Sequence, residues 1–128
     1  MKAITAEWVA KAEGDLDMGL LGLRSRKSLT YDAVCFHAQQ CAEKYLKAVF
    51  VEEGVAFPKT HDLRSLLNLM PDRGESWEAL RPSLVDLSDA AVTLRYPGET
   101  SDREAAKNAL ATARRVRALA RKRLRLSK

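Results

Sequence analysis

Apolar residues recur every three or four positions along most of the chain, which is the spacing that places side chains on one side of an α-helix. In residues 5–23 the apolar positions are Trp8, Ala12, Leu16, Gly19 or Leu20, and Leu23. In residues 31–53 they are Val34, His37 or Ala38, Cys41, Tyr45 and Ala48. The pattern therefore predicts two long amphipathic helices in the first half of the chain.

Three further helices are predicted in the second half. A short one over residues 61–70 has an apolar side formed by Leu63, Leu66, Leu67 and Met70. The next covers about 76–94, and Pro82 within it lacks the N–H that a helix interior needs, which predicts a kink or a late start there. The last opens at about residue 101 and turns toward the core Ala106, Ala109, Ala113, Val116, Ala120 and Leu124.

Residues at the edges of these segments predict where the helices begin and end. Thr30 and Thr60 precede the second and third helices and are expected to act as N-caps. Residues 101–104, Ser-Asp-Arg-Glu, have the capping-box pattern for the last helix. Gly54 and the Pro-Gly pair at 97–98 are expected to stop helices.

Composition favours an all-α fold. The chain has 18 leucines and 19 alanines but only nine Val and Ile residues, and unbranched side chains lose less rotamer freedom in helices. Its 128 residues, 46% hydrophobic and 30% charged, have the size and balance of one compact domain. We therefore expect residues 1–128 to form a single helical domain.

No segment predicts insertion into a membrane or export. The longest apolar run, residues 18–23, is far shorter than the roughly 20 residues that span a bilayer. Charged residues between Lys2 and Glu13 interrupt any signal sequence. Cys35 and Cys41 lie on different sides of one predicted helix and are expected to stay reduced. These features predict a cytoplasmic protein without a membrane partner.

Positive charge is concentrated in the last predicted helix. The chain carries +5 at pH 7, and residues 103–128 hold ten Lys and Arg and one acid, a net +9. Many of these cations share one side of the helix: Arg103, Lys107, Arg114, Arg117 or Arg121, Arg125 and Lys128. Such a stripe fits a nucleic-acid phosphate backbone, and it also fits a solvated face or an acidic partner.

The common phosphate-binding and metal-binding motifs are absent. None of the six glycines belongs to a GxxxxGK[ST] or GxGxxG loop. A structural zinc ion needs four ligands, and the only Cys and His residues are Cys35, His37, Cys41 and His61, of which Cys35 points away from the others on its helix. No metal and no cofactor is expected.

Two short segments at helix ends are candidate ligand sites. Arg95 and Tyr96 bring a cation and an aromatic ring close to the N-terminus of the last helix, where unbonded N–H groups favour anions. Lys59 and His61 lie in the second segment, where Thr60 and Asp62 could serve the helix N-terminus and His61 could act as a general base. Each segment also has a structural interpretation, as a helix-terminal Arg with a packing Tyr and as a locally bonded His beside an N-cap.

The order of these motifs resembles the prokaryotic HEPN domain family. Residues 31–48 contain the aromatic-led QQxxEKxLK pattern of a family helix, which includes Gln39, Glu43 and Lys47. Residues 58–63, Pro-Lys-Thr-His-Asp-Leu, are similar to a family loop, and residues 95–97 to its Arg-Tyr-Pro turn. Trp8, Ala12, Asp15 and Leu16 also fit, so the resemblance covers about residues 5–122.

The resemblance implies an antiparallel up-and-down bundle of four main helices plus one short helix. It also implies a homodimer, often encoded beside a minimal nucleotidyltransferase as a toxin–antitoxin-like pair. Other members bind nucleotides or cleave RNA. The family's ribonucleases place a His shortly after an Arg near the final helix, and neither Arg95 nor Arg103 is followed by one here. No catalytic residue is therefore predicted.

The leading hypothesis is a nucleotide- or RNA-binding interaction module. Its ligand-binding residues are predicted to be Arg95, Tyr96, Lys59, His61, Arg103 and Lys107. The alternatives are a ribonuclease toxin in which His61 replaces the missing His, and a purely structural dimer. A homodimer is also predicted from three successive apolar residues beyond one inward stripe, Val49, Phe50 and Val51.

Overall fold

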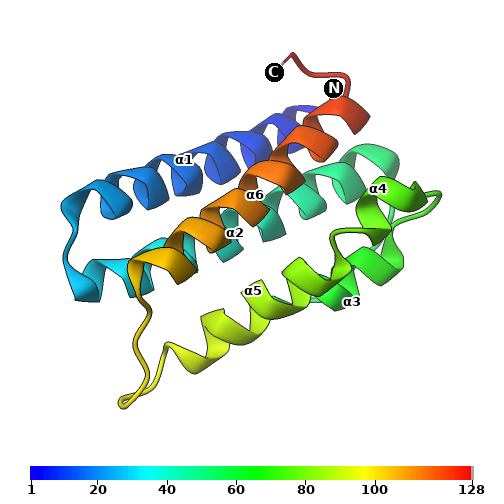
Figure 1. The fold of residues 1–128 in the computed structure, drawn as a ribbon. Helices are drawn as coiled ribbons and strands as arrows, with labels where there is room; N and C mark the ends of the chain where they lie inside the picture. Colours follow the sequence, from blue (N-terminus) through cyan, green and yellow to red (C-terminus); the bar gives the residue numbers. More distant parts are fainter. Residues whose placement is uncertain (128) are drawn as a thin grey trace.

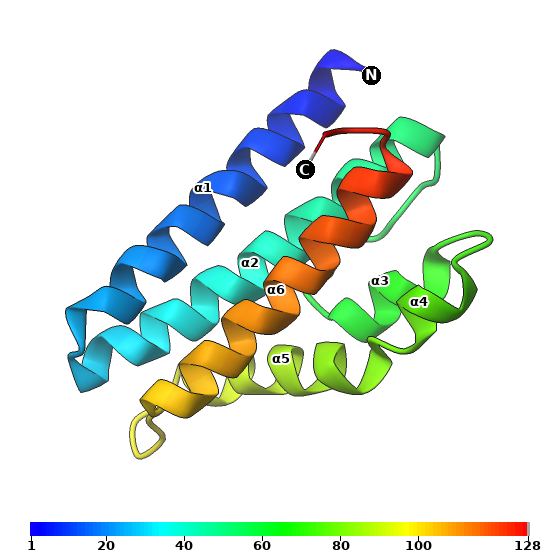
Figure 2. The ribbon, with the colours of Figure 1, turned by 45° about the horizontal axis from the view of Figure 1, so that its top comes forward.

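Four long helices alternate in direction along the chain in the computed structural model, which describes residues 1–127. Figures 1 and 2 show α1 (Ala3–Ser25) and α2 (Ser28–Glu53) as an antiparallel hairpin. α5 (Arg81–Thr93) returns along α2, and α6 (Arg103–Arg123) then runs parallel to α2. The short helices α3 (Leu63–Leu69) and α4 (Gly74–Glu78) connect α2 to α5. The all-α class and the up-and-down order are confirmed, but two short helices stand where one was predicted.

α2 is the central helix of the bundle. It packs along its length against α1 and α6, and α3 and α5 cover another part of it. The predicted core positions of α2 are buried, with Ala38 and not His37 as the inward one of that pair, and Val49 and Phe50 are fully inaccessible to solvent. Val49 and Phe50 therefore give no support to a homodimer, because a helix surrounded on several sides buries more than one stripe within its own chain. Val51 is partly buried.

α6 approaches α2 through small side chains. Ala106, Ala113 and Ala120 are fully buried. The other predicted core positions of this helix expose less than a tenth of their surface. Alanine at the contact lets two helix backbones come close together. The predicted apolar side of α6 is confirmed.

The α1–α2 hairpin is closed by a glycine contact and a left-handed residue. A Cβ atom on Gly22 would lie 2.7 Å from Cγ2 of Val34, so only glycine allows the two helices to approach this closely. Arg26, in the turn, has a φ of 57°. At the far end of α2, Gly54 has a φ of 70° and its N–H bonds to the last turn, which confirms the predicted stop.

The segment predicted as one helix over 76–94 is divided. α4 ends at Glu78 and α5 begins at Arg81, with Pro82 in its first turn. A first-turn N–H has no partner within the helix, so proline is tolerated there. The late start near Pro82 is the correct alternative, and the long fourth helix is wrong.

The N-caps predicted at Thr30, at Thr60 and at the start of the 101–104 box are wrong, whereas Asp62, also expected to serve the third helix, does so. α2 begins two residues before Thr30 and has no side-chain cap. At α3 the cap is Asp62, whose carboxylate accepts a 3.1 Å bond from the N–H of Arg64. At α6 the cap is Asp102, which accepts a 2.8 Å bond from the N–H of Ala105. In both cases a carboxylate one or two residues further along is the stronger acceptor for a helix N-terminus.

The two cysteines are buried and unpaired, as predicted. Burial is the main cause that raises the pKa of each thiol, to about 12 for Cys41, so neither has the thiolate character of a nucleophile. Within residues 1–127 no helix is both long enough and apolar enough to cross a bilayer.

Candidate functional site

Three polar side chains lie buried on one side of α2, four residues apart. Gln39, Glu43 and Lys47 each expose less than a tenth of their surface. Positions four apart in a helix lie above one another, so the three form a column inside the protein. This column is covered by the loop between α2 and α3, which contains Phe57 and His61.

The carboxylate of Glu43 is the centre of the column. It accepts bonds from Lys47 Nζ at 2.9 Å, from Gln39 Nε2 at 3.1 Å and from His61 Nδ1 at 2.9 Å. Burial raises the pKa of Glu43, but these three hydrogen bonds together outweigh it and the pKa is lowered. Glu43 is therefore ionised at neutral pH.

An ionised Glu43 fixes the orientation of His61. A carboxylate only accepts hydrogen bonds, so Nδ1 of His61 carries the proton and Nε2 is directed away from Glu43. Gln39 also donates a 2.8 Å bond to the backbone carbonyl of His61, which holds the loop in place. The imidazole is nonetheless 69% exposed. The protein thus presents an oriented histidine ring to solvent.

Lys47 has a structural role in the same cluster. Its ammonium is buried against Glu43 and lies 5.9 Å from the ring centre of Trp8 and 5.6 Å from that of Phe57. An ammonium enclosed by a carboxylate and two aromatic rings is stabilised where it is. Lys47 is therefore a support for Glu43 and not a ligand-binding group.

A small hollow opens beside His61. It has a volume of about 130 Å³ and lies between the loop before α3 and the outer side of α5. The residues that line it are Gln39, His61, Asp62, Arg64, Ser88, Asp89, Ala91, Val92 and Arg95. Pockets that enclose whole drug-sized ligands measure roughly 300 Å³ or more, so this one fits a single phosphate group and not a whole nucleotide.

The hollow brings together two of the six predicted ligand-binding residues, His61 and Arg95. Tyr96 follows Arg95 at the end of α5 and is 64% exposed, outside the lining of the hollow. Lys59 is also exposed and outside it. Arg103 and Lys107 lie on α6, where Arg103 donates a 2.9 Å bond to the carbonyl of Leu23 at the end of α1. The predicted set therefore divides between two regions of the surface.

An anion near Arg95 was predicted from unbonded N–H groups at the N-terminus of α6, and this reason does not hold. The N-terminus of α6 is occupied, because Asp102 bonds the N–H of Ala105 and Asp32 accepts a 2.7 Å bond from the N–H of Ser101. Two carboxylates at this end of α6 oppose an added anion. The prediction for Arg95 is supported instead by His61, which lies more than thirty residues earlier in the chain and lines the same hollow.

A second polar cluster, which the sequence did not reveal, joins α1 to α2. Asp15 is mostly buried and accepts bonds from Nδ1 of His37 at 2.8 Å and from Nζ of Lys44 at 2.6 Å. Asp15 and Lys44 both belong to the pattern that resembles the HEPN family, but that pattern does not show that the two residues meet. The i, i+7 spacing of His37 and Lys44 was the available signal, because it places both on the same side of α2.

A neighbouring cluster fastens α6 to the hairpin. Arg117 makes two bonds to Glu13, of 2.7 and 3.0 Å, and Tyr45 donates a 2.5 Å bond to the same carboxylate. The bond from Arg117 lowers the pKa of Glu13. Burial, together with the bond to Glu13, raises the pKa of Tyr45 to about 12. These groups hold three helices together and present no reactive atom.

A larger groove lies between α5 and α6. It has a volume of about 650 Å³ and is lined mainly by small and hydroxyl side chains of the two helices, with Cys35 at its base. The Cys35 thiol lies 3.3 Å from the hydroxyl of Ser101. No group of three or more His, Cys, Asp or Glu residues that could hold a metal ion occurs in the described part of the chain.

Comparisons with known proteins place the chain in one structural class. The family model of the HEPN domain matches residues 5–123. Protein TT1696 from Thermus thermophilus is similar in structure, with a TM-score of 0.81, 23% identity, and coverage of 93% of this chain and 97% of that one. An archaeal HEPN homologue, ST0689, has a TM-score of 0.75, 21% identity, and coverage of 95% and 98%. A search of curated proteins gave no match.

Proposed function

The chain belongs to the HEPN domain family, and we propose that it is a binding and interaction module that takes a phosphate group of a nucleotide or RNA between His61 and Arg95. The observation that carries the proposal is the 2.9 Å bond between Glu43 and His61, which orients an exposed imidazole at the rim of a hollow that Arg95 also lines.

The chemistry of the hollow suits an anion that is only partly enclosed. Arg95 supplies a planar fork of donors, and Nε2 of His61 becomes a second donor when the ring is protonated. Asp62 is already engaged, since it caps α3 and pairs with Arg64 at 3.8 Å. Asp89 is the remaining acid in the lining, and its negative charge opposes an anion. The attraction for a phosphate group therefore rests on Arg95 and His61.

Calorimetry with several purine nucleoside triphosphates, which occupy the hollow without spanning the rest of the surface, tests this site. Charge-assisted hydrogen bonds contribute roughly 1.5 to 3 kcal/mol, so Arg95→Ala should weaken binding about tenfold or more. Arg73→Ala is the matched control, because it removes one surface cation that pairs with Glu78 instead of lining the hollow. Equal affinities for wild type and Arg95→Ala, or no binding of any of these ligands, would contradict the proposal.

The proposed module acts as a homodimer and as the partner of a minimal nucleotidyltransferase in a toxin–antitoxin-like pair. Family membership supports both parts. For the dimer there is a second support, since Leu29 and Phe36 lie seven residues apart on the same side of α2 and are 78% and 41% exposed. Light scattering should give twice the chain mass of 14.3 kDa, and co-purification with the product of a neighbouring nucleotidyltransferase gene tests the pairing.

A ribonuclease is the second candidate, and the oriented imidazole of His61 is the observation that favours it. A histidine held by a carboxylate has the arrangement of a general base. We nevertheless expect no cleavage of a mixed RNA pool without metal, because the Arg-then-His arrangement of family ribonucleases is absent. Cleavage that disappears in His61→Ala would show that the protein is an enzyme.

A further inference from the structure

The cations of α6 divide into those bonded within the protein and those that are not. Arg117 pairs with Glu13 at 2.7 Å, and Arg123 pairs with Glu53 at 2.5 Å. Arg121 donates a 3.3 Å bond to the hydroxyl of Tyr45 on α2. These three residues fasten α6 to the rest of the chain, so the stripe predicted from the sequence is partly structural.

The remaining cations of the stripe are available to a partner. Lys107, Arg114 and Arg125 are exposed and make no side-chain hydrogen bond or ion pair within residues 1–127. A step of seven residues returns to nearly the same side of a helix, so Lys107 and Arg114 follow one line along α6, and Arg125 lies just beyond its end. Lys128, also predicted for this stripe, lies outside the described residues.

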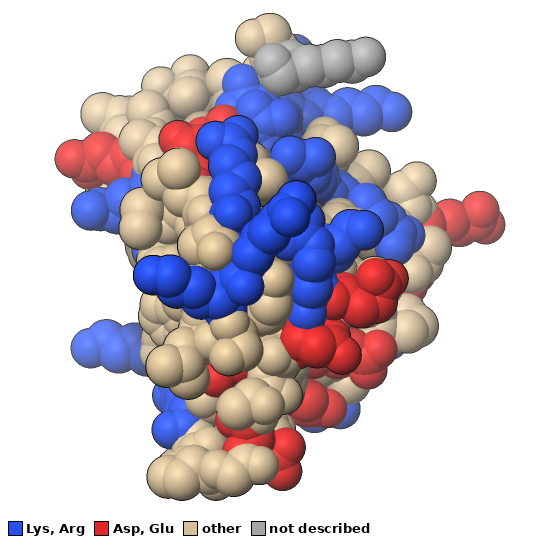
Figure 3. All heavy atoms as spheres, turned by 60° about the vertical axis from the view of Figure 1, so that its left-hand side comes forward, with Lys and Arg blue, Asp and Glu red and all other residues tan. Residues whose placement is uncertain are grey.

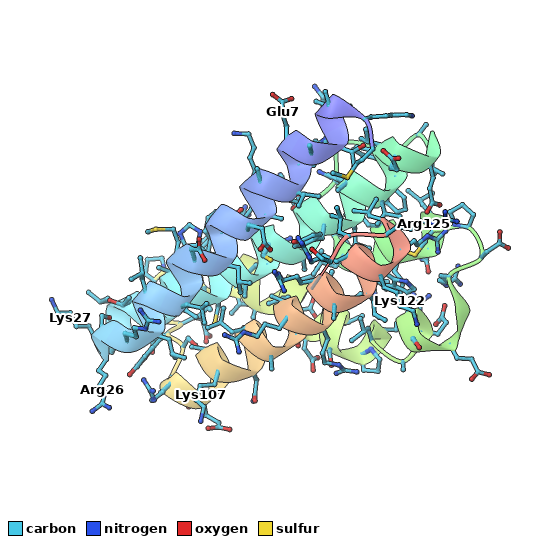
Figure 4. All side chains as sticks on the ribbon, turned by 90° about the horizontal axis from the view of Figure 1, so that it is seen from above. Glu7, Arg26, Lys27, Lys107, Lys122 and Arg125 are labelled. Atoms are coloured by element: carbon cyan, nitrogen blue, oxygen red, sulfur yellow. The ribbon has the colours of Figure 1, made fainter. Side chains whose placement is uncertain are left out.

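The turn between α1 and α2 adds further cations to the same end of the molecule. Arg24, Arg26 and Lys27 are exposed there. The bond from Arg103 to the carbonyl of Leu23 shows that the start of α6 lies against this turn. Figure 4 shows Arg26, Lys27 and Lys107 at one end of the bundle and Arg125 toward the other end of α6.

We call this surface the basic face, and it consists of Arg24, Arg26, Lys27, Arg103, Lys107, Arg114 and Arg125. Figure 3, which looks toward the hairpin turn and the start of α6, shows Lys and Arg side chains gathered in one area, with acidic side chains mostly below it. Two segments about eighty residues apart in sequence thus form one positively charged surface.

The composition of the basic face favours a nucleic acid over a protein partner. Protein interfaces have an apolar centre and are depleted in lysine, whereas protein–nucleic acid interfaces are polar and strongly positive. The exposed apolar residues of α6 are all alanines, and Glu104 is the one acid of the helix. Beside the cations of the turn, Leu21 and Leu29 are exposed as well. No member of the basic face is aromatic, so base stacking has no platform there.

We propose that the basic face binds the sugar–phosphate backbone of a nucleic acid without regard to its sequence. The 21 residues of α6 extend about 30 Å, which is long enough to follow several phosphates. The face lies on α1 and α6, whereas the hollow at His61 lies on α2, α3 and α5. Polynucleotide binding here is therefore independent of nucleotide binding in the hollow.

Fluorescence anisotropy with labelled RNA of about 20 nucleotides, as a single strand and as a duplex, tests the proposal between about 50 and 200 mM salt. The variant is Lys107→Glu, and the matched control is Lys11→Glu. Both change the net charge from +5 to +3. Lys11 is exposed and stands about 200° around α1 from Glu13, which faces α6, so it lies away from the basic face.

The expected result is that Lys107→Glu weakens RNA binding about tenfold and reduces the dependence of affinity on salt, while Lys11→Glu binds like wild type. Mononucleotide affinity should be the same in all three proteins. Equal losses in the two variants would show that only net charge matters, and no loss with Lys107→Glu, or no RNA binding at the lowest salt, would also overturn the proposal. A higher affinity for the single strand or for the duplex shows which form of RNA the basic face binds.

Discussion

Two clusters beside α2 have the same three components and different surroundings. Asp15 binds His37 and Lys44, and Glu43 binds His61 and Lys47. The imidazole of His37 is 26% exposed and lies between α1 and α2, whereas that of His61 is 69% exposed at the rim of the hollow. In the second cluster it is the carboxylate and lysine that are most deeply buried.

The difference shows that a histidine–carboxylate pair acquires its role from what surrounds it. His37 and Lys44 hold Asp15 across the hairpin, so the first cluster fastens two helices together. His61 stands on a loop, and its ring is oriented by Glu43 from inside the protein while its other side meets solvent near Arg95. The same kind of hydrogen bond joins two helices in one place and, in the other, orients a ring that we propose binds a ligand.

The largest expected effect is on stability. Glu43→Ala leaves the buried ammonium of Lys47 without a counter-ion, which should cost about 3 to 5 kcal/mol of unfolding free energy. Asp15→Ala should cost about 1 to 2 kcal/mol, because Lys44 and His37 can reach water. Urea denaturation measures both, and equal losses would contradict the distinction between the two clusters.

Substitution of His61 should affect nucleotide affinity, and substitution of His37 should not. His61→Ala removes the donor that Nε2 of the protonated ring offers to the proposed phosphate, and it should weaken nucleotide binding about fivefold, as the loss of roughly 1 kcal/mol requires. His37→Ala removes a ring that does not line the hollow and should leave the affinity unchanged. Calorimetry on the two variants checks this, provided that circular dichroism shows both to be folded.

Acid should reduce the stability that the ionised Glu43 gives to the folded protein. The pKa of Glu43 is lower in the folded protein than its ordinary value of 4.5, so its ionised form adds stability above that pH. This contribution is lost as the pH falls below 4.5 and through the folded pKa. Glu43→Gln should therefore lose less stability than wild type between about pH 6 and pH 3, as followed by urea midpoints. The same acid dependence in both proteins would show that Glu43 contributes nothing to it.

The sequence predicted the helices better than it predicted the contacts between them. Helical periodicity depends on neighbouring residues, so the buried positions of α2 and α6 could be identified in advance. At α3 the sequence left Thr60 and Asp62 open as caps, and at α6 Asp102 was missed beside Ser101, because only the backbone path decides which side chain reaches the N–H groups.

The candidate site was predicted only in part. His61 and Arg95 were each selected from local motifs, but their meeting in one hollow depends on how α5 packs against α2. Glu43 and Lys47 were named only as members of the family pattern, and the loop that buries both of them could not be inferred from spacing. Long-range packing decides which polar residues are enclosed, and no local pattern encodes it.

The most direct measurement is a nucleotide titration followed by NMR of the imidazole protons. The chain contains only two histidines, so each cluster supplies one set of ring signals. His61→Ala assigns them. On addition of a nucleoside triphosphate the ring signals of His61 should shift in proportion to saturation, while those of His37 stay in place. Signals of His61 that do not move, or movement confined to His37, would contradict the assignment of the phosphate site to the hollow between His61 and Arg95.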